Sequence, residues 1–382
     1  MSGLPLLPHP GLLFTLASFI GIIAVLVIVH EGGHYLAGRL FGARIEAFGV
    51  GFGPELLGRT DRRGVRWRIN AIPLGGYVKF VGDMNEASQL DPALMALPEK
   101  ERRGLFAFLP LWQRAFIVAA GPFINFLFAI AVLAIYNLSV GYYTAPAQVA
   151  QVLPGSAAAQ AGLRVGDNVL RVDGTKVDRF EDMVHIVMTS TGGSLALDVD
   201  RAGQPLRLMV TPKMVETVDR FGNVNRVPQL GIASPPERLR PVGPVAAVRW
   251  ALLDTWSITT AIGRAISQVV LGERALTDMG GPVQTAKIAG EQASLGLAAT
   301  VRFLAFFSIN IGFINLLPIP MLDGGHLLLY GIEAVRRRPL ADAVQQWAFM
   351  SGFAALMSLM AVLTWYDIAK VGLWQSLSGW LG

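Results

Sequence analysis

Four stretches of this chain are apolar over enough length to cross a lipid bilayer. A membrane-spanning helix needs roughly 20 predominantly apolar residues, and each of these stretches contains few strongly polar side chains. The first begins with a run from Gly11 to Val29 that contains no charged residue. The pattern predicts four transmembrane helices, at about 11–33, 115–136, 301–322 and 347–366.

The third predicted span is irregular toward its end. Asn315, Pro318 and Pro320 interrupt its apolar pattern shortly before Asp323, which is the first charged residue after Arg302. Proline removes a backbone N–H and clashes with the preceding turn, so the helix should break there. Irregular backbone at membrane depth is tolerated only inside a protein or beside a water-filled cavity. The break therefore predicts a functional position near Asp323.

The segment that follows the first span has a different period. Val65, Trp67 and Ile69 alternate with polar residues, which is typical of a β-strand with two distinct faces. Glycines are frequent on both sides of this alternation. We therefore expect residues 44–82 to form β-hairpins that lie against the membrane or re-enter it.

Residues 145–213 alternate short apolar runs with turn signals and predict a small soluble α+β domain. A strand leads to a Pro-Gly turn, an Ala-rich helix, a Gly-Asp pair, a second strand and an Asp-Gly turn at Gly174. The stretch 248–271 is apolar but contains Arg249, Asp254 and Arg264. A helix that lies at the membrane interface fits this stretch better than a fifth crossing.

The fold class predicted by these patterns is a polytopic α-helical membrane protein with a membrane-associated β-hairpin region and one soluble α+β domain. In the sequence, the soluble parts lie between the two halves of the membrane core. The predicted boundaries are 1–144 for the first half, 145–213 for the soluble domain, 214–296 for a linker with the interfacial helix, and 297–382 for the second half.

Composition supports a membrane protein and limits its chemistry. The chain is 53% hydrophobic and only 15% charged, whereas a soluble domain is about a quarter charged. The absence of cysteine excludes disulfides and cysteine-ligated metals. The net charge of +5 is attributed to the bias of cytoplasmic loops toward Lys and Arg, and no nucleic-acid partner is expected.

Basic residues also predict the orientation of the spans. They are concentrated between Arg39 and Arg114 and in the Arg336–Arg338 triplet, so both loops should be cytoplasmic. The region 137–300 should then be outside and should contain no crossing. No Lys or Arg precedes Arg39, so the first apolar run is expected to be retained as a span rather than removed as a signal peptide.

The pentad His30-Glu31-Gly32-Gly33-His34 lies at the end of the first predicted span. On a helix its two imidazoles are four residues apart and share a face, with a carboxylate beside them, which is the ligand pair and general base of zinc hydrolases. A catalytic zinc site needs a third protein ligand. Asp323 is the preferred candidate and His326 the alternative, since both follow the broken helix at the same predicted membrane depth.

Several segments together resemble the site-2 protease family of intramembrane zinc metalloproteases, in the bacterial subgroup that includes the regulator of sigma-E protease (RseP). The resemblance covers nearly the whole chain, including the soluble region, which resembles a PDZ domain. One departure is that the sigma-E protease has two tandem PDZ domains, whereas one is expected here. The matching segments are the pentad, Gly75–Lys79, Gly121–Asn125, Gly281–Pro282 with Ala286–Gly290, and Asn315–Gly325.

The resemblance implies a role for each candidate residue. His30, His34 and Asp323 would hold zinc, and Glu31 would be the general base. Asn315 would hydrogen-bond the substrate backbone, and Asn125 would contact the site from the second span. The Val65–Phe80 strands would extend an unwound substrate by edge pairing. The residues expected to contact substrate are Asn315, Asn125, Gly75, Gly76 and Tyr77.

The resemblance also implies substrates and a location. The substrates would be single-span membrane proteins of the anti-sigma-factor type and signal-peptide remnants, cleaved in the bacterial inner membrane near its cytoplasmic side. The PDZ domain would be extracytoplasmic and act as a size filter or as a tail-binding module. Two other functions remain open at this point, a metal transporter and a noncatalytic PDZ-bearing membrane adaptor.

Overall fold

The fold comes from a computed structural model, in which the chain forms two compact units. One unit comprises Pro10–Ile130 and Met279–Gly382, and the other comprises Met1–His9 and Ala131–Asp278. Each is described separately below. The structure describes residues 10–82, 98–190, 193–218, 224–236, 238–273, 275, 280–338 and 340–371.

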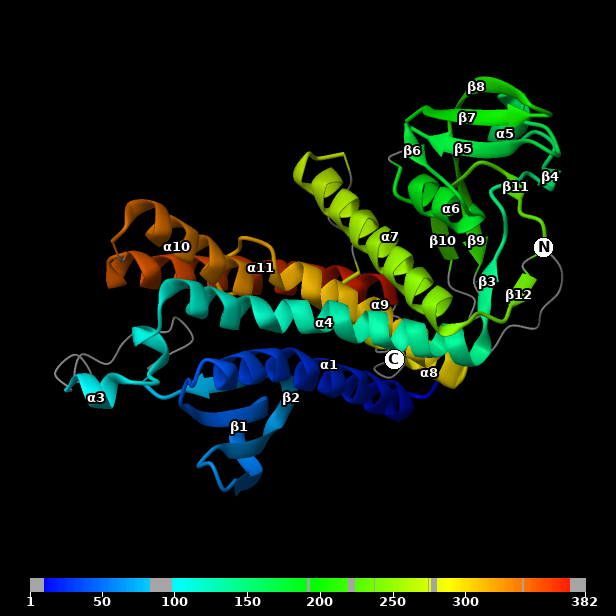
Figure 1. The fold of residues 1–382 in the computed structure, drawn as a ribbon. Coiled ribbons are helices and arrows are strands. Elements are labelled where there is room, and N and C mark those ends of the chain that lie inside the picture. The colour runs from blue at the N-terminus through cyan, green and yellow to red at the C-terminus, as the bar shows by residue number, and fades with distance from the viewer. Residues whose placement is uncertain are drawn as a thin grey trace. The chain divides into compact units, whose positions relative to one another are not determined.

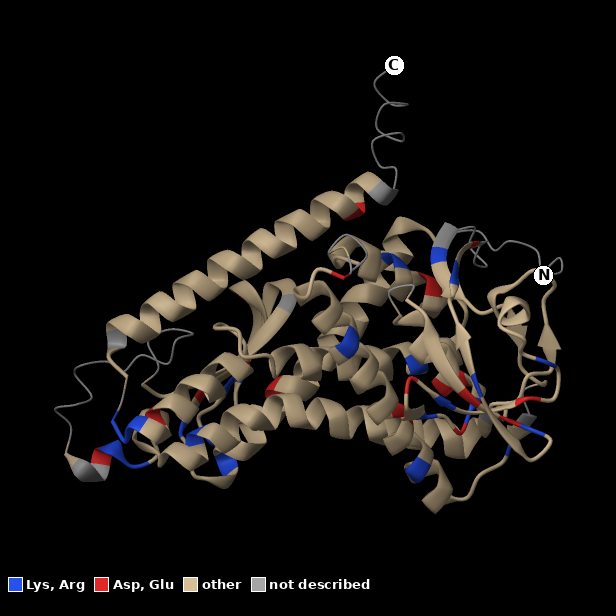
Figure 2. Ribbon diagram, turned by 90° about the horizontal axis from the view of Figure 1, so that it is seen from above, with Lys and Arg blue, Asp and Glu red and all other residues tan. Residues whose placement is uncertain are grey.

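Four helices among the described residues are long and apolar enough to cross a membrane, as predicted. Their charged residues lie mostly toward the helix ends (Figure 2). The third ends at Asn315 rather than near residue 322, because the prolines that follow cannot continue it. The four are α1 (Leu12–Leu40), α4 (Leu111–Val140), α9 (Leu297–Asn315) and the Ala343–Ala369 stretch of α11 (Asp342–Val371).

The predicted β region forms directly after α1 and lies beside it (Figure 1). β1 (Ile45–Thr60) and β2 (Arg66–Phe80) are long, bent strands whose pairing shifts register repeatedly. Phe48 is opposite both Val78 and Trp67. The first half of β1 is therefore an internal strand, and the Gly76–Phe80 end of β2 forms an edge of the sheet.

Shorter elements complete the first unit. α8 packs against α1, α9 and α11. Its N-terminus is capped by Asp367 of α11, whose carboxylate accepts hydrogen bonds from the backbone N–H groups of Gly281 and Gln284. The short elements are α3 (Glu99–Arg102), the 3₁₀ helix η1 (Phe106–Phe108), α8 (Pro282–Ser294) and α10 (Asp323–Arg336).

The second unit contains a four-stranded antiparallel sheet in the order β6-β5-β7-β8, with separate pairs β10-β9, β11-β4 and β12-β3. Its core is formed by residues such as Val149, Val172 and Leu197. The elements are β3 (Tyr142–Thr144), β4 (Gln151–Val152), α5 (Ala157–Gln160), β5 (Asn168–Val172), β6 (Thr175–Lys176), α6 (Phe180–Met188), β7 (Leu195–Arg201), β8 (Gln204–Val210), β9 (Lys213–Val218), β10 (Val224–Gln229), β11 (Ile232–Ala233), β12 (Arg238–Arg240) and α7 (Pro244–Val270).

The local order predicted for 145–213, from strand to Ala-rich helix to strand, is present as β4, α5 and β5. The structure adds strands to the stretch that was predicted as a linker. β11 pairs with β4, so a segment after residue 213 contributes to the sheet structure of this unit. The predicted helix at 248–271 is present as α7. Leu252 and Trp256 are exposed on it, whereas Ala251 and Thr255 are buried.

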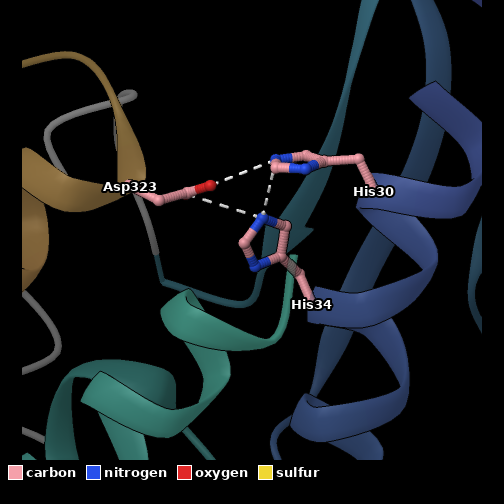
Figure 3. Close-up of side chains that lie close together, drawn as sticks. All are labelled: His30, His34 and Asp323. Atoms are coloured by element: carbon pink, nitrogen blue, oxygen red, sulfur yellow. Dashed lines mark hydrogen bonds and ion pairs between the residues drawn. The ribbon is translucent and has the colours of Figure 1, made fainter. Parts of the chain in front are cut away.

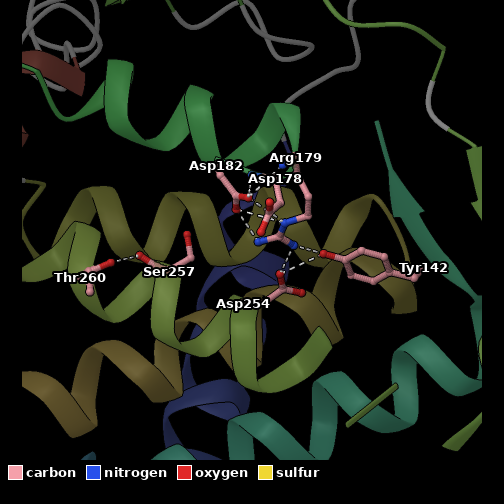
Figure 4. A network of polar contacts seen from close by, with 7 residues as sticks. All are labelled: Tyr142, Asp178, Arg179, Asp182, Asp254, Ser257 and Thr260. Carbon is pink, nitrogen blue, oxygen red and sulfur yellow. Dashed lines mark hydrogen bonds and ion pairs between the residues drawn. The ribbon is translucent and has the colours of Figure 1, made fainter. Parts of the chain in front are cut away.

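A buried arginine connects three elements of the second unit (Figure 4). Arg179, at the start of α6, donates hydrogen bonds to Asp182 and to Asp254 of α7, and to the hydroxyl of Tyr142 on β3. Tyr142 also stacks on Trp250 of α7. Burial alone would lower the pKa of Arg179, but its hydrogen bonds to the two aspartates raise that pKa above its ordinary value. Its positive charge is thus retained inside the unit.

Candidate metal centre

Three side chains that are distant in sequence converge in the first unit (Figure 3). Nε2 of His30 lies 3.1 Å from Oδ2 of Asp323, and Nε2 of His34 lies 3.5 Å from Oδ1. The two Nε2 atoms are 3.4 Å apart. One ligand atom from each residue lies within 4.8 Å of the others, the only such group of three among the residues that the structure describes. The sequence prediction that these residues meet is therefore matched by the geometry.

Helix geometry explains how the two histidines meet. α1 continues past its charge-free run to Leu40, so His30 and His34 lie four residues apart on one helical face. Asp323 begins α10, after the turn that follows α9. The three side chains are only 11%, 12% and 16% exposed. Groups of this polarity are stable in such surroundings only when they are paired or bound to an ion.

Backbone contacts from α4 orient His34. Its Nδ1 lies 2.9 Å from the carbonyl oxygen of Ile117, to which it donates its proton. This fixes the tautomer and leaves the lone pair of Nε2 directed at Asp323 and His30. Two glycines permit the close approach of the helices. A Cβ on Gly121 would overlap the His34 ring, and a Cβ on Gly33 would overlap the carbonyl of Ala120.

Asn125, also on α4, orients His30. Its side-chain amide lies 3.1 Å from Nδ1 of His30, and the residue is fully buried. The atom that faces Nδ1 is the amide nitrogen, and the amide oxygen has no hydrogen-bond partner. A half-turn of the amide lets that oxygen accept the Nδ1 proton, which again leaves Nε2 as a metal ligand. Ser308 of α9 supports this position by donating a hydrogen bond to the Asn125 carbonyl, at 2.9 Å.

These ligand atoms fit a bound metal ion. Oδ2 of Asp323 is buried without a hydrogen-bond partner. Nε2 of His30 faces this oxygen, and Nε2 of His34 faces Oδ1 of the same carboxylate. A divalent cation would satisfy all three groups at once. Two imidazoles and one carboxylate are a donor set that zinc takes in catalytic sites, where a further position stays open for water or substrate. The predicted alternative ligand, His326, lies elsewhere, with its ring 4.6 Å from that of Phe349.

Comparisons with known proteins agree with this geometry. The family model described as peptidase family M50 matches residues 18–359. A protein of Mesorhizobium japonicum is 41% identical over 93% of this chain and 98% of its own length, and one of Agrobacterium fabrum is 42% identical over 93% and 96%. Both are named as zinc metalloproteases. Metalloprotease MmpA of Caulobacter vibrioides is 35% identical over 97% of this chain and 99% of its own length.

The chain belongs to peptidase family M50. It is an integral membrane zinc metalloprotease of the site-2 protease family, as the sequence resemblance implied. A solved PDZ domain of an SdrC-like protein of Listeria monocytogenes matches 24% of this M50 peptidase and 90% of that domain. The match has 17% identity and a TM-score of 0.20. This likeness is too slight to assign the fold of the second unit.

Glu31 of this M50 peptidase lies where α1 meets the edge of β2. The backbone N–H of Val78 faces its carboxylate. A Cβ on Gly76 would lie 3.2 Å from Cγ of Glu31 and would overlap Val27. Gly76 is therefore required for the sheet edge to approach the helix at the level of the metal ligands.

The other residues predicted to contact substrate are distributed around this centre. Asn315 is the last residue of α9 and half-buried. Gly75 has a positive φ of 76° and faces the Phe52 ring, and Tyr77 stacks on the same ring within the sheet. Asn125 lies behind His30, so its position favours holding the imidazole over the predicted contact with substrate.

Sequence patterns did not identify Ile117, Val78 and Ser308. Ile117 and Val78 act through backbone atoms, to which side-chain identity gives no guide. Ser308 is one of several hydroxyl residues in the apolar helices. The spacing Gly121-x-x-x-Asn125, by contrast, could have indicated which face of α4 packs against the histidines, because it places a small residue and an amide on one helical face.

Proposed function

We propose that this M50 peptidase hydrolyses peptide bonds inside the transmembrane segments of other membrane proteins. The observation that carries the proposal is the convergence of His30, His34 and Asp323, with Glu31 beside them. His30, Glu31 and His34 lie on α1, which is apolar enough to cross a membrane. A transporter would also need ligands in its helices. It would not need a glutamate held next to the metal ligands and a sheet edge.

Each residue of the centre has a role in hydrolysis. His30, His34 and Asp323 would hold the zinc ion, which would supply the Lewis acidity that makes water a nucleophile near neutral pH. Glu31 accepts a proton as the water oxygen bonds to the scissile carbonyl carbon. It then donates that proton to the amide nitrogen as the C–N bond breaks. The Val78 N–H directs the Glu31 carboxylate, and Asn125 and the Ile117 carbonyl hold the imidazoles.

The free edge of β2 fits a substrate in extended form. A transmembrane substrate is helical, and its peptide bonds are engaged in its own hydrogen bonds. Because Val78 directs its N–H to Glu31 and away from β1, alternation along the strand directs the backbone of Gly76 to the same side. A locally unwound substrate that paired there would pass directly beside Glu31.

We propose that the β region re-enters the membrane beside α1. Phe80 lies against Gly38, and Gly76 lies against Val27. The Gly76–Phe80 end of β2 therefore runs along α1 in the direction of the helix, and the sheet reaches back from the end of α1 to the level of Val27. The strand segments near Gly76 carry exposed apolar side chains that lipid would cover. Four examples are Phe52 (45% exposed), Leu57 (67%), Ile69 (52%) and Ile72 (49%).

The remaining assignments follow from charge and resemblance. Both basic loops would be cytoplasmic and the metal centre would lie near that side of a bacterial inner membrane. The second unit would be extracytoplasmic, would contain a single PDZ domain and would act as a size filter or tail-binding module. The substrates would be single-span proteins already trimmed outside, of the anti-sigma-factor type, and signal-peptide remnants.

Replacement of Glu31 by glutamine tests the mechanism. Glu31→Gln in the full-length protein should reduce cleavage of a model transmembrane substrate by about 10²–10⁴-fold while zinc content stays normal. Glu46→Gln is a matched control, because Glu46 is an exposed strand residue that pairs with Lys79. Normal cleavage by Glu31→Gln would contradict the mechanism. Zinc flux into proteoliposomes without cleavage would favour a transporter.

A further inference from the structure

The turn that delivers Asp323 to the metal centre is tightly folded. It runs from Leu316 to Leu322 between α9 and α10. The N–H of Ile319 binds the carbonyl of Leu317 at 2.7 Å, and the N–H of Leu322 binds the carbonyl of Ile319 at 3.1 Å. Met321 has a φ of 86°, which is unfavourable for a residue with a side chain. The turn therefore has little freedom to absorb a displacement.

One side of this turn is covered by the first residues of α10. A Cβ on Gly324 would overlap the carbonyl oxygens of Leu316 and Leu317. A Cβ on Gly325 would overlap the carbonyl of Ile319 and lie 2.7 Å from Cα of Pro320. Since the obstructing atoms belong to the backbone, no side-chain rotation relieves these contacts. The turn is thus fixed against the helix that Asp323 begins.

Helix α11 also packs against the turn. A Cβ on Gly352 would lie 2.7 Å from Cβ of Pro320 and 2.8 Å from its carbonyl carbon, and would overlap its carbonyl oxygen. Gly352 itself is buried. Pro320 is therefore in close contact with Gly325 of α10 and with Gly352 of α11. A side chain at position 352 would displace Pro320 from its place against α11.

We infer that Gly352 is a positioning residue for the metal ligand Asp323. Pro320 precedes Asp323 by three residues, and Met321 between them is already strained. Gly325, two residues after Asp323, packs against the same proline, so a displacement of Pro320 is transmitted to Asp323. Metal ligands must stay within about 0.2 Å of their preferred distances. Helix α11, which contributes no metal ligand, thus sets the position of Asp323. The inference rests on the proposed set of zinc ligands.

Zinc affinity of full-length protein in detergent is the readout. Gly352→Ala should bind zinc at least about tenfold more weakly in chelator competition, because the third ligand is displaced. The absorption spectrum of the cobalt-substituted protein should shift, and the apparent melting temperature of the metal-free protein should stay near that of the wild type. Gly331→Ala on α10 is the control, because a Cβ there meets nothing within 4 Å. It should leave affinity and spectrum unchanged.

Two further variants separate the possible failures. Gly325→Ala presses on Pro320 from the α10 side and should also weaken zinc binding, which provides a second readout if Gly352→Ala does not fold. Asp323→Ala tests the ligand set itself. If Asp323→Ala loses zinc while folded Gly352→Ala keeps wild-type affinity and spectrum, the positioning role is wrong and the proposed function stands. If Asp323→Ala retains wild-type affinity, the ligand set is wrong and the inference falls with it.

Discussion

The side-chain amide of Asn125 lies 3.1 Å from Nδ1 of His30, on the other side of the ring from the Nε2 atom that faces Asp323. The amide is therefore placed to fix the ring and its tautomer without occupying a metal position. Neutral imidazole ligands depend on such contacts, because a ring that protonates at Nε2 cannot bind a metal.

Asn125→Leu should lower zinc affinity by about 10–100-fold, the usual effect of removing a hydrogen-bond partner from a ligating histidine. Asn125→Asp should restore most of the affinity, because a carboxylate also accepts the Nδ1 proton. Chelator competition on the purified protein measures both. Asn137→Leu is the control, since Asn137 is also buried on α4 but lies more than three turns away. Equal affinities for wild type and Asn125→Leu would rule out the orienting role.

Gly121→Ala should damage the centre through His34. The added Cβ would overlap the imidazole ring, and the hydrogen bond from Nδ1 to the Ile117 carbonyl opposes withdrawal of the ring. Overpacking of this kind costs about 1–3 kcal/mol, so zinc should bind about tenfold more weakly. Gly21→Ala on α1 meets nothing within 4 Å and should be neutral. Cleavage and zinc content measured together would reveal the effect, and a fully active Gly121→Ala protein would show that the helices can separate.

The spans and the two histidines could be predicted because their signals are local. Apolar length alone locates α1, α4, α9 and α11, and a spacing of four residues places His30 and His34 on one face. Asp323 could be predicted as a ligand because the prolines before it mark a broken helix. Of the strands added between 213 and 240, β11 and β12 were not predicted because they are short and pair with the distant strands β4 and β3.

The contacts that refine the centre depend on tertiary packing. The Ile117 carbonyl and the Val78 N–H are present in any sequence, and only the fold brings them to His34 and Glu31. Gly352 is one of many glycines in the chain. Its contact with Pro320 joins segments that no spacing rule connects.

The second unit should lose stability in acid through Asp167. This carboxylate is 1% exposed and accepts two hydrogen bonds from Arg201, which hold its pKa below the ordinary value. A lowered folded-state pKa stabilises the fold above the unfolded value of about 3.9, and this contribution disappears as the pH falls through the folded-state pKa. Arg201→Gln should therefore weaken the sheet at neutral pH, and its difference from the wild type should shrink below about pH 4.

Hydrogen exchange of the β7 and β8 amides in the full-length protein measures this effect. At neutral pH Arg201→Gln should exchange about tenfold faster, the size expected when a charged hydrogen bond worth about 1.5 kcal/mol is lost. Arg207→Gln removes an exposed partner of Asp198 on the same sheet, at 3.6 Å, and should change exchange by less than about twofold. A difference between Arg201→Gln and wild type that grew in acid would show that Asp167 is not the group responsible.

Substitutions at Gly76 can distinguish two functions of the β2 edge, namely support of Glu31 and pairing with substrate. Gly76→Ala and Gly76→Pro both add a Cβ that overlaps Val27 and approaches Glu31. Only proline also removes the backbone N–H that an edge-paired substrate would use. If substrate adds to this edge, Gly76→Pro should cleave about tenfold more slowly than Gly76→Ala, roughly the loss expected for one hydrogen bond, while both retain the same zinc content.

The comparison also distinguishes edge pairing from simple support of Glu31. Val78→Pro would remove the backbone N–H that faces Glu31, and should slow cleavage even of a short, unstructured peptide. Gly76→Pro should affect a long transmembrane substrate more than such a peptide, because a short peptide depends less on strand addition. Equal rates for Gly76→Pro and Gly76→Ala on the transmembrane substrate would eliminate the Gly76 edge as its binding site. The Val78 contact would then remain only as a support for the general base.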